Sequence, residues 1–122
     1  YLDLYIKEGD EKYIVRSIGG FFRFTNFNKC LSRKKNIFNE LKTLFPDAKV
    51  FERSGSHSFD KSGKSKQVLS AFLLEDSTKA DHIRIDCVAW TKEMKRKYNS
   101  FDHLVVVVMT KEILSWTEAG YK

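Results

Sequence analysis

The sequence has few residues of the kinds that build membrane-spanning helices or metal clusters. Among its 122 residues are two cysteines, three histidines and one proline. Its longest hydrophobic run, residues 104–109, is far shorter than the roughly 20 apolar residues that cross a bilayer. No signal-peptide pattern is present. We therefore expect no membrane partner.

The two cysteines, Cys30 and Cys87, lie far apart in the sequence and fit no metal-ligand spacing. We expect them to be two buried thiols in a reducing compartment, which would place the protein in the cytoplasm or the nucleus. The histidines, His57, His82 and His103, form neither an HxH nor an HExxH pattern. Their spacing argues against a zinc site.

No nucleotide-binding motif is complete. Gly63-Lys64-Ser65 matches the end of a phosphate-binding P-loop, but Ser58 stands where the motif needs its first glycine. The residues that follow are apolar and strand-like, whereas a P-loop leads into a helix. These two departures exclude a P-loop NTPase, and the residues alone indicate no cofactor.

The strongest structural signal is a run of four valines within residues 101–109. Consecutive β-branched residues favour a strand, and a short continuous apolar run is typical of a central strand with both faces covered. We expect a single domain over residues 1–122, with an N-terminal hairpin and aromatic segment at 1–27 and an α/β core at 28–122. Because the chain begins with Tyr1, we also expect it to be a fragment of a longer chain.

The pattern of residues 29–45 predicts one main amphipathic helix. Its apolar residues recur at helical spacing, Asn26 or Asn28 can cap its first turn, and Pro46 ends it. Lys34 falls on the apolar stripe, where we expect its stem to pack and its ammonium group to reach water.

Composition and spacing predict the remaining elements. We expect strands at 1–7, 13–18, 48–52, 67–74, 82–90 and 101–109, a break at Gly19-Gly20, a loop at 75–81, a short basic helix at 91–98 and a strand or helix at 112–116. The expected fold class is α+β, or α/β, with an N-terminal β-hairpin, one main amphipathic helix and a mixed sheet around a central buried strand.

The net charge of +6 is concentrated in one part of the chain. Residues 29–66 hold ten Lys and Arg against four Asp and Glu, whereas the segments before and after are each balanced. A local excess of positive charge favours a polyanionic partner, most often nucleic acid. A merely soluble lysine-rich surface and an acidic protein partner remain the alternatives.

Residues 53–66 form the most polar stretch, with serines, glycines, four Lys or Arg residues and one histidine that suit phosphate contacts. Phe59 is the aromatic side chain best placed to be exposed there and to stack on a base, whereas Phe51 and Trp90 are expected in the core. The residues expected to contact nucleic acid, with DNA favoured, are Lys29, Arg33, Lys35, Arg53, His57, Phe59, Lys61, Lys64, Lys66, Lys95, Arg96 and Lys97.

From residue 29 onward the expected order is helix, three strands, short helix and strand. Together with Ser58-Phe59-Asp60 and Ile85-Asp86-Cys87-Val88, this order resembles the core of the PD-(D/E)xK, or restriction-endonuclease-like, superfamily. The resemblance implies a restriction or repair endonuclease in which Asp60 and Asp86 hold a divalent metal such as Mg²⁺ and a lysine activates water.

Val88 occupies the position where that superfamily has its lysine, and Lys92 or Lys66 would have to substitute. We therefore expect DNA binding without cleavage in magnesium or manganese. A third possibility is a protein-interaction module that uses the open edge of the N-terminal hairpin to add a partner strand. A homodimer or a larger parent protein is compatible with each of these functions.

Overall fold

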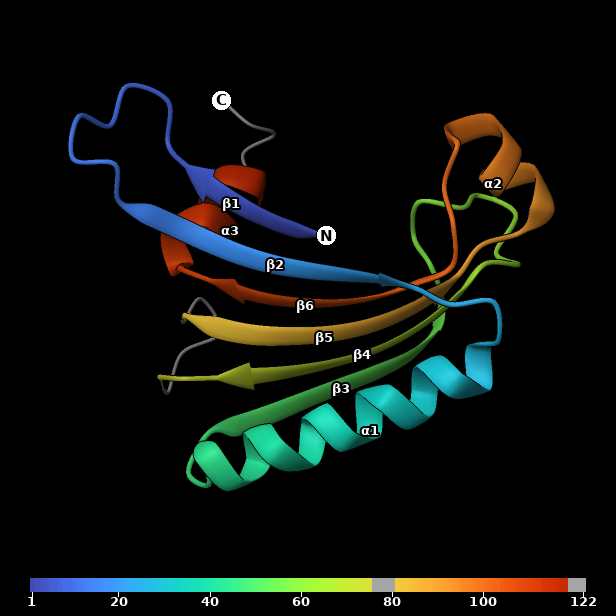
Figure 1. Ribbon diagram of the computed structural model, residues 1–122, viewed down its shortest axis with the longest axis horizontal. Helices are drawn as coiled ribbons and strands as arrows, with labels where there is room; N and C mark the ends of the chain where they lie inside the picture. Colours follow the sequence, from blue (N-terminus) through green and yellow to red (C-terminus); the bar gives the residue numbers. More distant parts are fainter. Residues whose placement is uncertain (76–80, 119–122) are drawn as a thin grey trace.

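The computed structural model describes residues 1–75 and 81–118, and Figure 1 shows their arrangement. The strands are β1 (Leu2–Ile6), β2 (Val15–Arg23), β3 (Lys49–Ser56), β4 (Lys66–Leu73), β5 (His82–Ala89) and β6 (His103–Met109), and the helices are α1 (Phe27–Leu44), α2 (Lys92–Tyr98) and α3 (Lys111–Glu118). The strands form one six-stranded sheet in the order β1-β2-β6-β5-β4-β3. The hairpin β1–β2 therefore belongs to the same sheet as the strands that follow α1.

The coarse fold class is confirmed, because the molecule combines an antiparallel sheet with helices in an α+β arrangement. The N-terminal hairpin and the main helix are present. The prediction of a mixed sheet is wrong, since each of the five strand pairs is antiparallel. The physical reason is that α1 carries the chain from β2, which lies beside the edge strand β1, to β3 at the opposite edge of the sheet. The later strands then return by short connections, which favour antiparallel neighbours.

Helix α1 begins and ends as its sequence predicts. The side chain of Asn26 accepts hydrogen bonds from the backbone N–H groups of Asn28 and Lys29, and the helix ends before Phe45 and Pro46. Its apolar stripe packs on one face of the sheet, which we call the α1 face. The core there comprises Cys30, Phe72, Ile83, Ile85, Cys87 and Leu104.

Lys34 differs from expectation, because its ammonium group is buried rather than solvated. Its Nζ donates to Ser70 Oγ, and Ser70 Oγ in turn donates to Glu52 Oε1 at 3.2 Å. Burial lowers the pKa of Lys34, and the carboxylates of Glu52 and Asp86 oppose that shift.

Cys30 and Cys87 form a disulfide that joins α1 to β5, so the prediction of two separate thiols is wrong. Their burial was predicted correctly, since both side chains are at most 1% exposed. The register explains the pairing: Cys87 lies on the α1 face of β5, opposite Leu104. Disulfides persist mainly in oxidising compartments. The expected reducing compartment was inferred from two free thiols, so that inference no longer has support. Among the described residues, no helix is long and apolar enough to cross a membrane.

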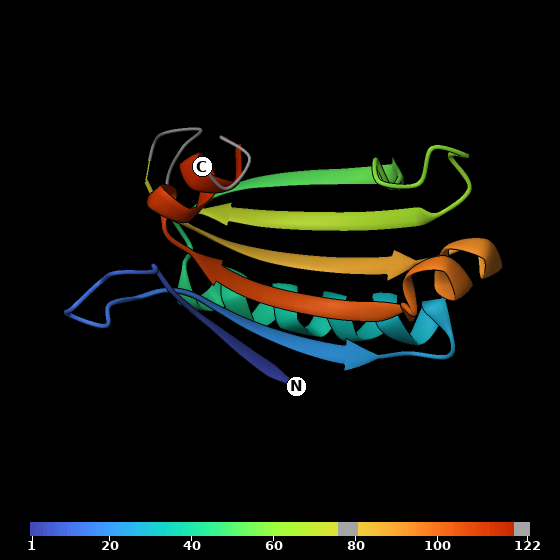
Figure 2. The same cartoon turned by 90° about the horizontal axis from the view of Figure 1, so that it is seen from above.

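β6 lies inside the sheet, between β2 and β5, as the valine run predicted. Only one of its faces is covered by α1, however. Figure 2 shows the strands in front of α1, with α2 and α3 at opposite ends of the uncovered side, which we call the open face. Val105 and Val107 point to the open face and are still only 8% exposed, because neighbouring side chains on the curved sheet surround them.

Two strands are longer than predicted. β2 continues through Gly19-Gly20, which pair with Val107 and Val106 instead of breaking the chain. A Cβ atom at Gly19 would lie 3.3 Å from Val107 Cγ2, so glycine allows the two strands to pack closely. β3 extends to Ser56, which shortens the predicted polar loop to residues 57–65. Residues 112–116 are helical within α3, and most of the predicted loop at 75–81 lies outside the described residues.

Candidate nucleic-acid interface

Five ring side chains that are far apart in the sequence form a line across the open face. The line runs from the residue next to β1 to the loop between β3 and β4. We call Tyr1, Phe21, His103, Trp90 and His57 the aromatic row. Successive ring centroids lie 4.9, 6.1, 6.4 and 4.4 Å apart, and Tyr1 stacks on Phe21 with an interplanar angle of 8°. Strand alternation creates this row, because the register puts Phe21 and His103 on the face away from α1.

A chain of polar side chains lies beside the row on β3, β4 and β5. Arg53 Nη2 donates to Gln67 Oε1 at 3.1 Å, and Gln67 Nε2 donates to Asp86 Oδ2 at 2.7 Å. Arg84 Nη2 reaches the same carboxylate oxygen at 2.6 Å. We call these four residues the polar network. Asp86 is only 2% exposed, so its charge is held by Arg84 and Gln67 rather than by water.

Three buried polar atoms of this region have no hydrogen-bond partner within the described residues. They are Asp86 Oδ1, Arg84 Nε and Trp90 Nε1. A buried polar atom without a partner costs about 1–3 kcal/mol, and most buried polar groups in native proteins are satisfied. Trp90 Nε1 belongs to the aromatic row, and the other two atoms belong to the polar network beside it.

His57 connects the row to the network. Burial lowers the pKa of its imidazole; Asp86 opposes this shift, and Arg84, His103 and Arg53 add to it. The imidazole is therefore neutral at neutral pH, and it presents a hydrogen-bonding edge rather than a charge.

The loop at residues 57–65 is fixed by Asp60, one of the two candidate catalytic acids. Its carboxylate accepts hydrogen bonds from the backbone N–H groups of Ser62 and Ser65 and from the Ser65 hydroxyl. These bonds lower the pKa of Asp60 to about 2. Asp60 thus holds the turn that places Ser65 Oγ to accept from the Thr91 N–H at 3.1 Å.

Asp86, the other candidate acid, lies in the polar network, and Val88 lies on the same face of β5. Among the described residues, no group of three or more His, Cys, Asp or Glu side chains is placed to hold a metal ion. The resemblance to the PD-(D/E)xK superfamily thus rests on element order, and the pair Asp60 and Asp86 remains a prediction as a catalytic site.

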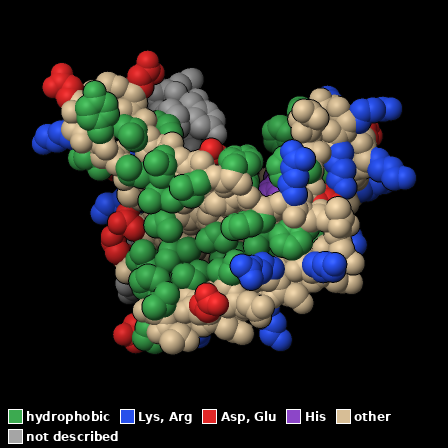
Figure 3. Space-filling model, in the orientation of Figure 1, with side chains coloured by type: hydrophobic (Ala, Val, Ile, Leu, Met, Phe, Trp, Pro, Cys, Tyr) green, Lys and Arg blue, Asp and Glu red, His purple; other side chains and the backbone are tan. Residues whose placement is uncertain are grey.

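Cations gather at the end of the molecule that carries α2. One cleft of about 550 Å³ is lined by Arg23, Lys29 and Lys95, and another of about 560 Å³ is lined by Lys64 and Lys66. We call these five residues the basic end. Figure 3 shows Lys and Arg side chains over α2 and the first turns of α1, with a hollow between this projection and the one formed around the β1–β2 hairpin.

The structure divides the predicted contact residues among three places. Arg53 and His57 lie on the open face, while Phe59, Lys61, Lys64, Lys66, Lys95, Arg96 and Lys97 lie on the adjoining loop, strand end and α2. Arg33 and Lys35 are exposed on α1, which covers the other face of the sheet, whereas Lys29 in the first turn of α1 reaches the basic end. Phe59 is exposed, as predicted, and its ring lies 5.3 Å from Tyr98.

Sequence reasoning missed Tyr1, Phe21, Gln67, Arg84 and His103. Phe51, which was expected in the core, is 54% exposed, and the register places it on the open face of β3. One pattern in the sequence could have indicated the polar face of the sheet. In β5, the charged residues Arg84 and Asp86 alternate with apolar residues. That alternation predicts which residues share a face, but the strand order is needed to bring Phe21 next to His103.

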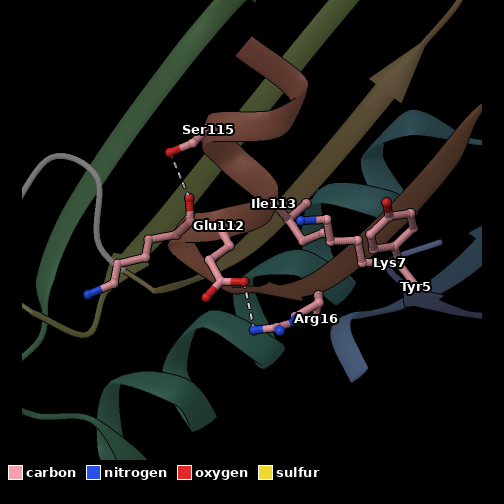
Figure 4. Close-up of a pocket in the computed structure, with 7 residues that line it drawn as sticks. Tyr5, Lys7, Arg16, Glu112, Ile113 and Ser115 are labelled. Carbon is pink, nitrogen blue, oxygen red and sulfur yellow. Dashed lines mark hydrogen bonds and ion pairs between the residues drawn. The ribbon is translucent and has the colours of Figure 1, made fainter. Parts of the chain in front are cut away.

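A separate cavity of about 600 Å³ lies at the opposite end, between the hairpin and α3 (Figure 4). Its lining includes Tyr5, Lys7 and Ile113, and Arg16 faces Glu112 across it with an ion pair of 2.6 Å. Arg16 also lies 3.8 Å from Asp10. These contacts attach α3 to β2. We therefore interpret this cavity and its ion pairs as packing between the hairpin and α3.

The fold and this surface define an α+β protein whose antiparallel sheet is covered by a helix on one side and presents rings and charges on the other. Comparison with family models, with curated proteins and with solved structures found no match to this chain.

Proposed function

We propose that this protein binds single-stranded nucleic acid across the open face. Bases stack on the aromatic row, and phosphates contact the basic end and the arginines of the polar network. The observation that carries the proposal is the aromatic row, because exposed and half-buried rings in line beside cations match the two components of single-strand binding.

Duplex DNA fits this surface less well than an unpaired strand. In a duplex the bases stack on each other, so their faces cannot stack on protein rings. An unpaired strand exposes the face of each base. The cations and the ring surface accept single-stranded DNA and RNA alike, because both strands carry the same charged phosphates and unpaired bases. The salt dependence should be steep, since each neutralised phosphate releases counterions.

The test is a fluorescence-anisotropy titration of labelled single-stranded DNA, single-stranded RNA and duplex DNA at low and high salt. Phe21→Leu should weaken single-strand binding by about 5- to 150-fold, from the roughly 1–3 kcal/mol that a stacked base contributes. Phe22→Leu is the matched control, because Phe22 is the next residue and points to the α1 face. Its affinity should be unchanged.

Two results would reject the proposal. One is no binding of any single strand at low salt. The other is an equal effect of the two substitutions in folded protein, which would show that the open face is not the contact surface.

A second candidate function is a protein-interaction module, and it is favoured by an apolar area on the α1 face that α1 leaves uncovered. Leu4, Ile18 and Val108 align across β1, β2 and β6 and are 59%, 44% and 46% exposed. Figure 3 shows this hydrophobic area between β2 and α1. β1 is also an edge strand, which a partner strand can extend.

A second copy of the chain is the simplest partner for this area, since it carries the same edge and the same apolar residues. Sedimentation over a range of concentrations measures the association, and Ile18→Lys should abolish it without changing oligonucleotide affinity. A monomer at every concentration would remove this second function.

A further inference from the structure

The two histidines of the aromatic row have different hydrogen-bonding edges. His103 Nδ1 lies 3.0 Å from the carbonyl oxygen of Phe101, which can only accept, so the proton is assigned to Nδ1 and Nε2 keeps its lone pair. His57 Nδ1 accepts the backbone N–H of Phe59 at 3.2 Å, so its proton is assigned to Nε2. His103 thus offers a base, and His57 offers a donor.

The rings of both histidines lie next to the ring of Trp90. The ring of Trp90 lies 4.4 Å from His57 and 6.4 Å from His103, and the charges of Arg84, Arg53 and Asp86 act on His57. A phosphodiester that crosses Trp90 would have a base on one side and a neutral N–H donor with two guanidinium groups on the other. The carboxylate of Asp86 holds Arg84 in place, which makes Asp86 a positioning residue.

We propose that this site cleaves RNA by transferring the phosphoryl group from the 5′-oxygen of one nucleotide to the 2′-oxygen of the preceding nucleotide. The inference rests on the proposed function, because the strand must first lie across the open face. The step needs no metal ion, since the nucleophile is the 2′-hydroxyl of the substrate.

His103 Nε2 takes the proton of the 2′-hydroxyl, and the 2′-oxygen forms a bond to phosphorus. The bond from phosphorus to the 5′-oxygen breaks, and that oxygen takes a proton from water, while the imidazolium of His103 returns its proton to the solvent. The products are a 2′,3′-cyclic phosphate and a 5′-hydroxyl. His57 Nε2–H and the guanidinium groups of Arg84 and Arg53 donate to the non-bridging oxygens, where negative charge increases.

The experiment uses one RNA sequence and its 2′-O-methyl version, which has the same bases and phosphates but no nucleophile. Binding is measured with the 2′-O-methyl strand, and cleavage is measured with the RNA in excess EDTA. We expect both strands to bind with affinities within a few fold and only the RNA to be cut. Mass spectrometry should find a terminal cyclic phosphate.

His103→Phe is the critical variant, because it keeps a ring in the row and removes the base. It should lower the cleavage rate by about 10²- to 10⁴-fold and leave binding of the 2′-O-methyl strand within a few fold. Purified in the same way, it also controls for a contaminating ribonuclease. His103→Asn, whose amide can still donate to the Phe101 carbonyl, is the second variant if the first does not fold.

His57→Gln removes one ring of the row and should weaken binding, but it keeps a neutral N–H donor. At saturating RNA it should therefore retain cleavage within about tenfold of the wild-type rate, a loss typical of a weakened rather than a deleted hydrogen bond. A loss as large as that of His103→Phe would overturn the roles assigned here. Binding without cleavage, or cleavage that persists in both His103 variants, would overturn the inference and leave the proposed function standing. Failure of both strands to bind would reject the proposed function itself.

Discussion

The two faces of the sheet use alternate residues of the same strands and differ in how completely they are satisfied. On the α1 face, Ile83, Ile85 and Cys87 of β5 pack in a closed core with α1. On the open face, Arg84 and Asp86 of the same strand each retain a buried polar atom that has no partner in residues 1–75 and 81–118. β5 thus contributes to the core through one set of residues, and under the proposed function it contributes to binding through the residues between them.

The largest effect is expected from a charge on the α1 face. Ile85→Asp should prevent folding, because Ile85 is fully buried and an unpaired carboxylate there costs several kcal/mol of a total of roughly 5–15 kcal/mol. Arg84→Lys, one residue away on the open face, keeps its charge and should fold. Circular dichroism melts compare the two, and a cooperative melt of Ile85→Asp would show that the core is misplaced.

The disulfide should come next. The double variant Cys30→Ala, Cys87→Ala should lose about 2–4 kcal/mol of unfolding free energy, since the bond closes a loop between residues 57 positions apart. Urea melts measure the loss, and a reducing agent should destabilise the wild type to the same extent but leave the double variant unchanged. Oligonucleotide affinity should stay the same, because the bond lies on the α1 face. Identical melts for both proteins would contradict a disulfide in solution.

A smaller effect is expected on binding. Lys61→Ala, Lys64→Ala and Lys66→Ala together should weaken single-strand affinity by about tenfold or more at low salt and flatten its salt dependence, because three phosphate contacts are lost. Arg33→Ala with Lys35→Ala is the matched control on the exposed side of α1 and should change affinity by less. A larger loss of affinity in the control than in the triple variant would contradict the proposed binding surface.

The smallest effect concerns Lys34. Lys34→Met should change stability by less than about 1 kcal/mol at neutral pH, because Ser70 can still donate to Glu52 and an apolar chain fills the same space. The pH dependence should differ more. The pKa of Lys34 is lowered in the fold, so between that value and 10.5 the unfolded chain binds more protons. The unfolding free energy of the wild type should therefore increase relative to that of the variant as pH rises through this range. Parallel curves would contradict a buried, charged Lys34.

The parts of the fold that depend on neighbouring residues were predictable. The cap at Asn26, the stop at Pro46 and the apolar stripe between them determine α1, and the extent of β5 was predicted to within one residue. Gly19-Gly20 was misread because a pair of glycines usually breaks a strand, whereas here Val107 fills the space that a side chain would occupy.

Features that depend on contacts between distant segments were not predictable. The bond between Cys30 and Cys87 requires knowing that α1 lies over β5. The aromatic row likewise requires Phe21 beside His103, which only the pairing of β2 with β6 provides. The basic residues were found by composition, but composition does not indicate that Arg33 and Lys35 lie on a different side from Arg53.

The pairing of β2 with β6 also has a consequence for the order of folding. Strands β3 to β6 are joined by short connections and form a local antiparallel meander, whereas β2 must find a partner near the other end of the described chain. Contacts of this separation raise the contact order and slow the search, because a large loop must close before they form. We expect the meander with α1 to form first. During synthesis, β2 leaves the ribosome well before β6 exists, so it pairs with β1 alone and its other edge stays unpaired until β6 arrives.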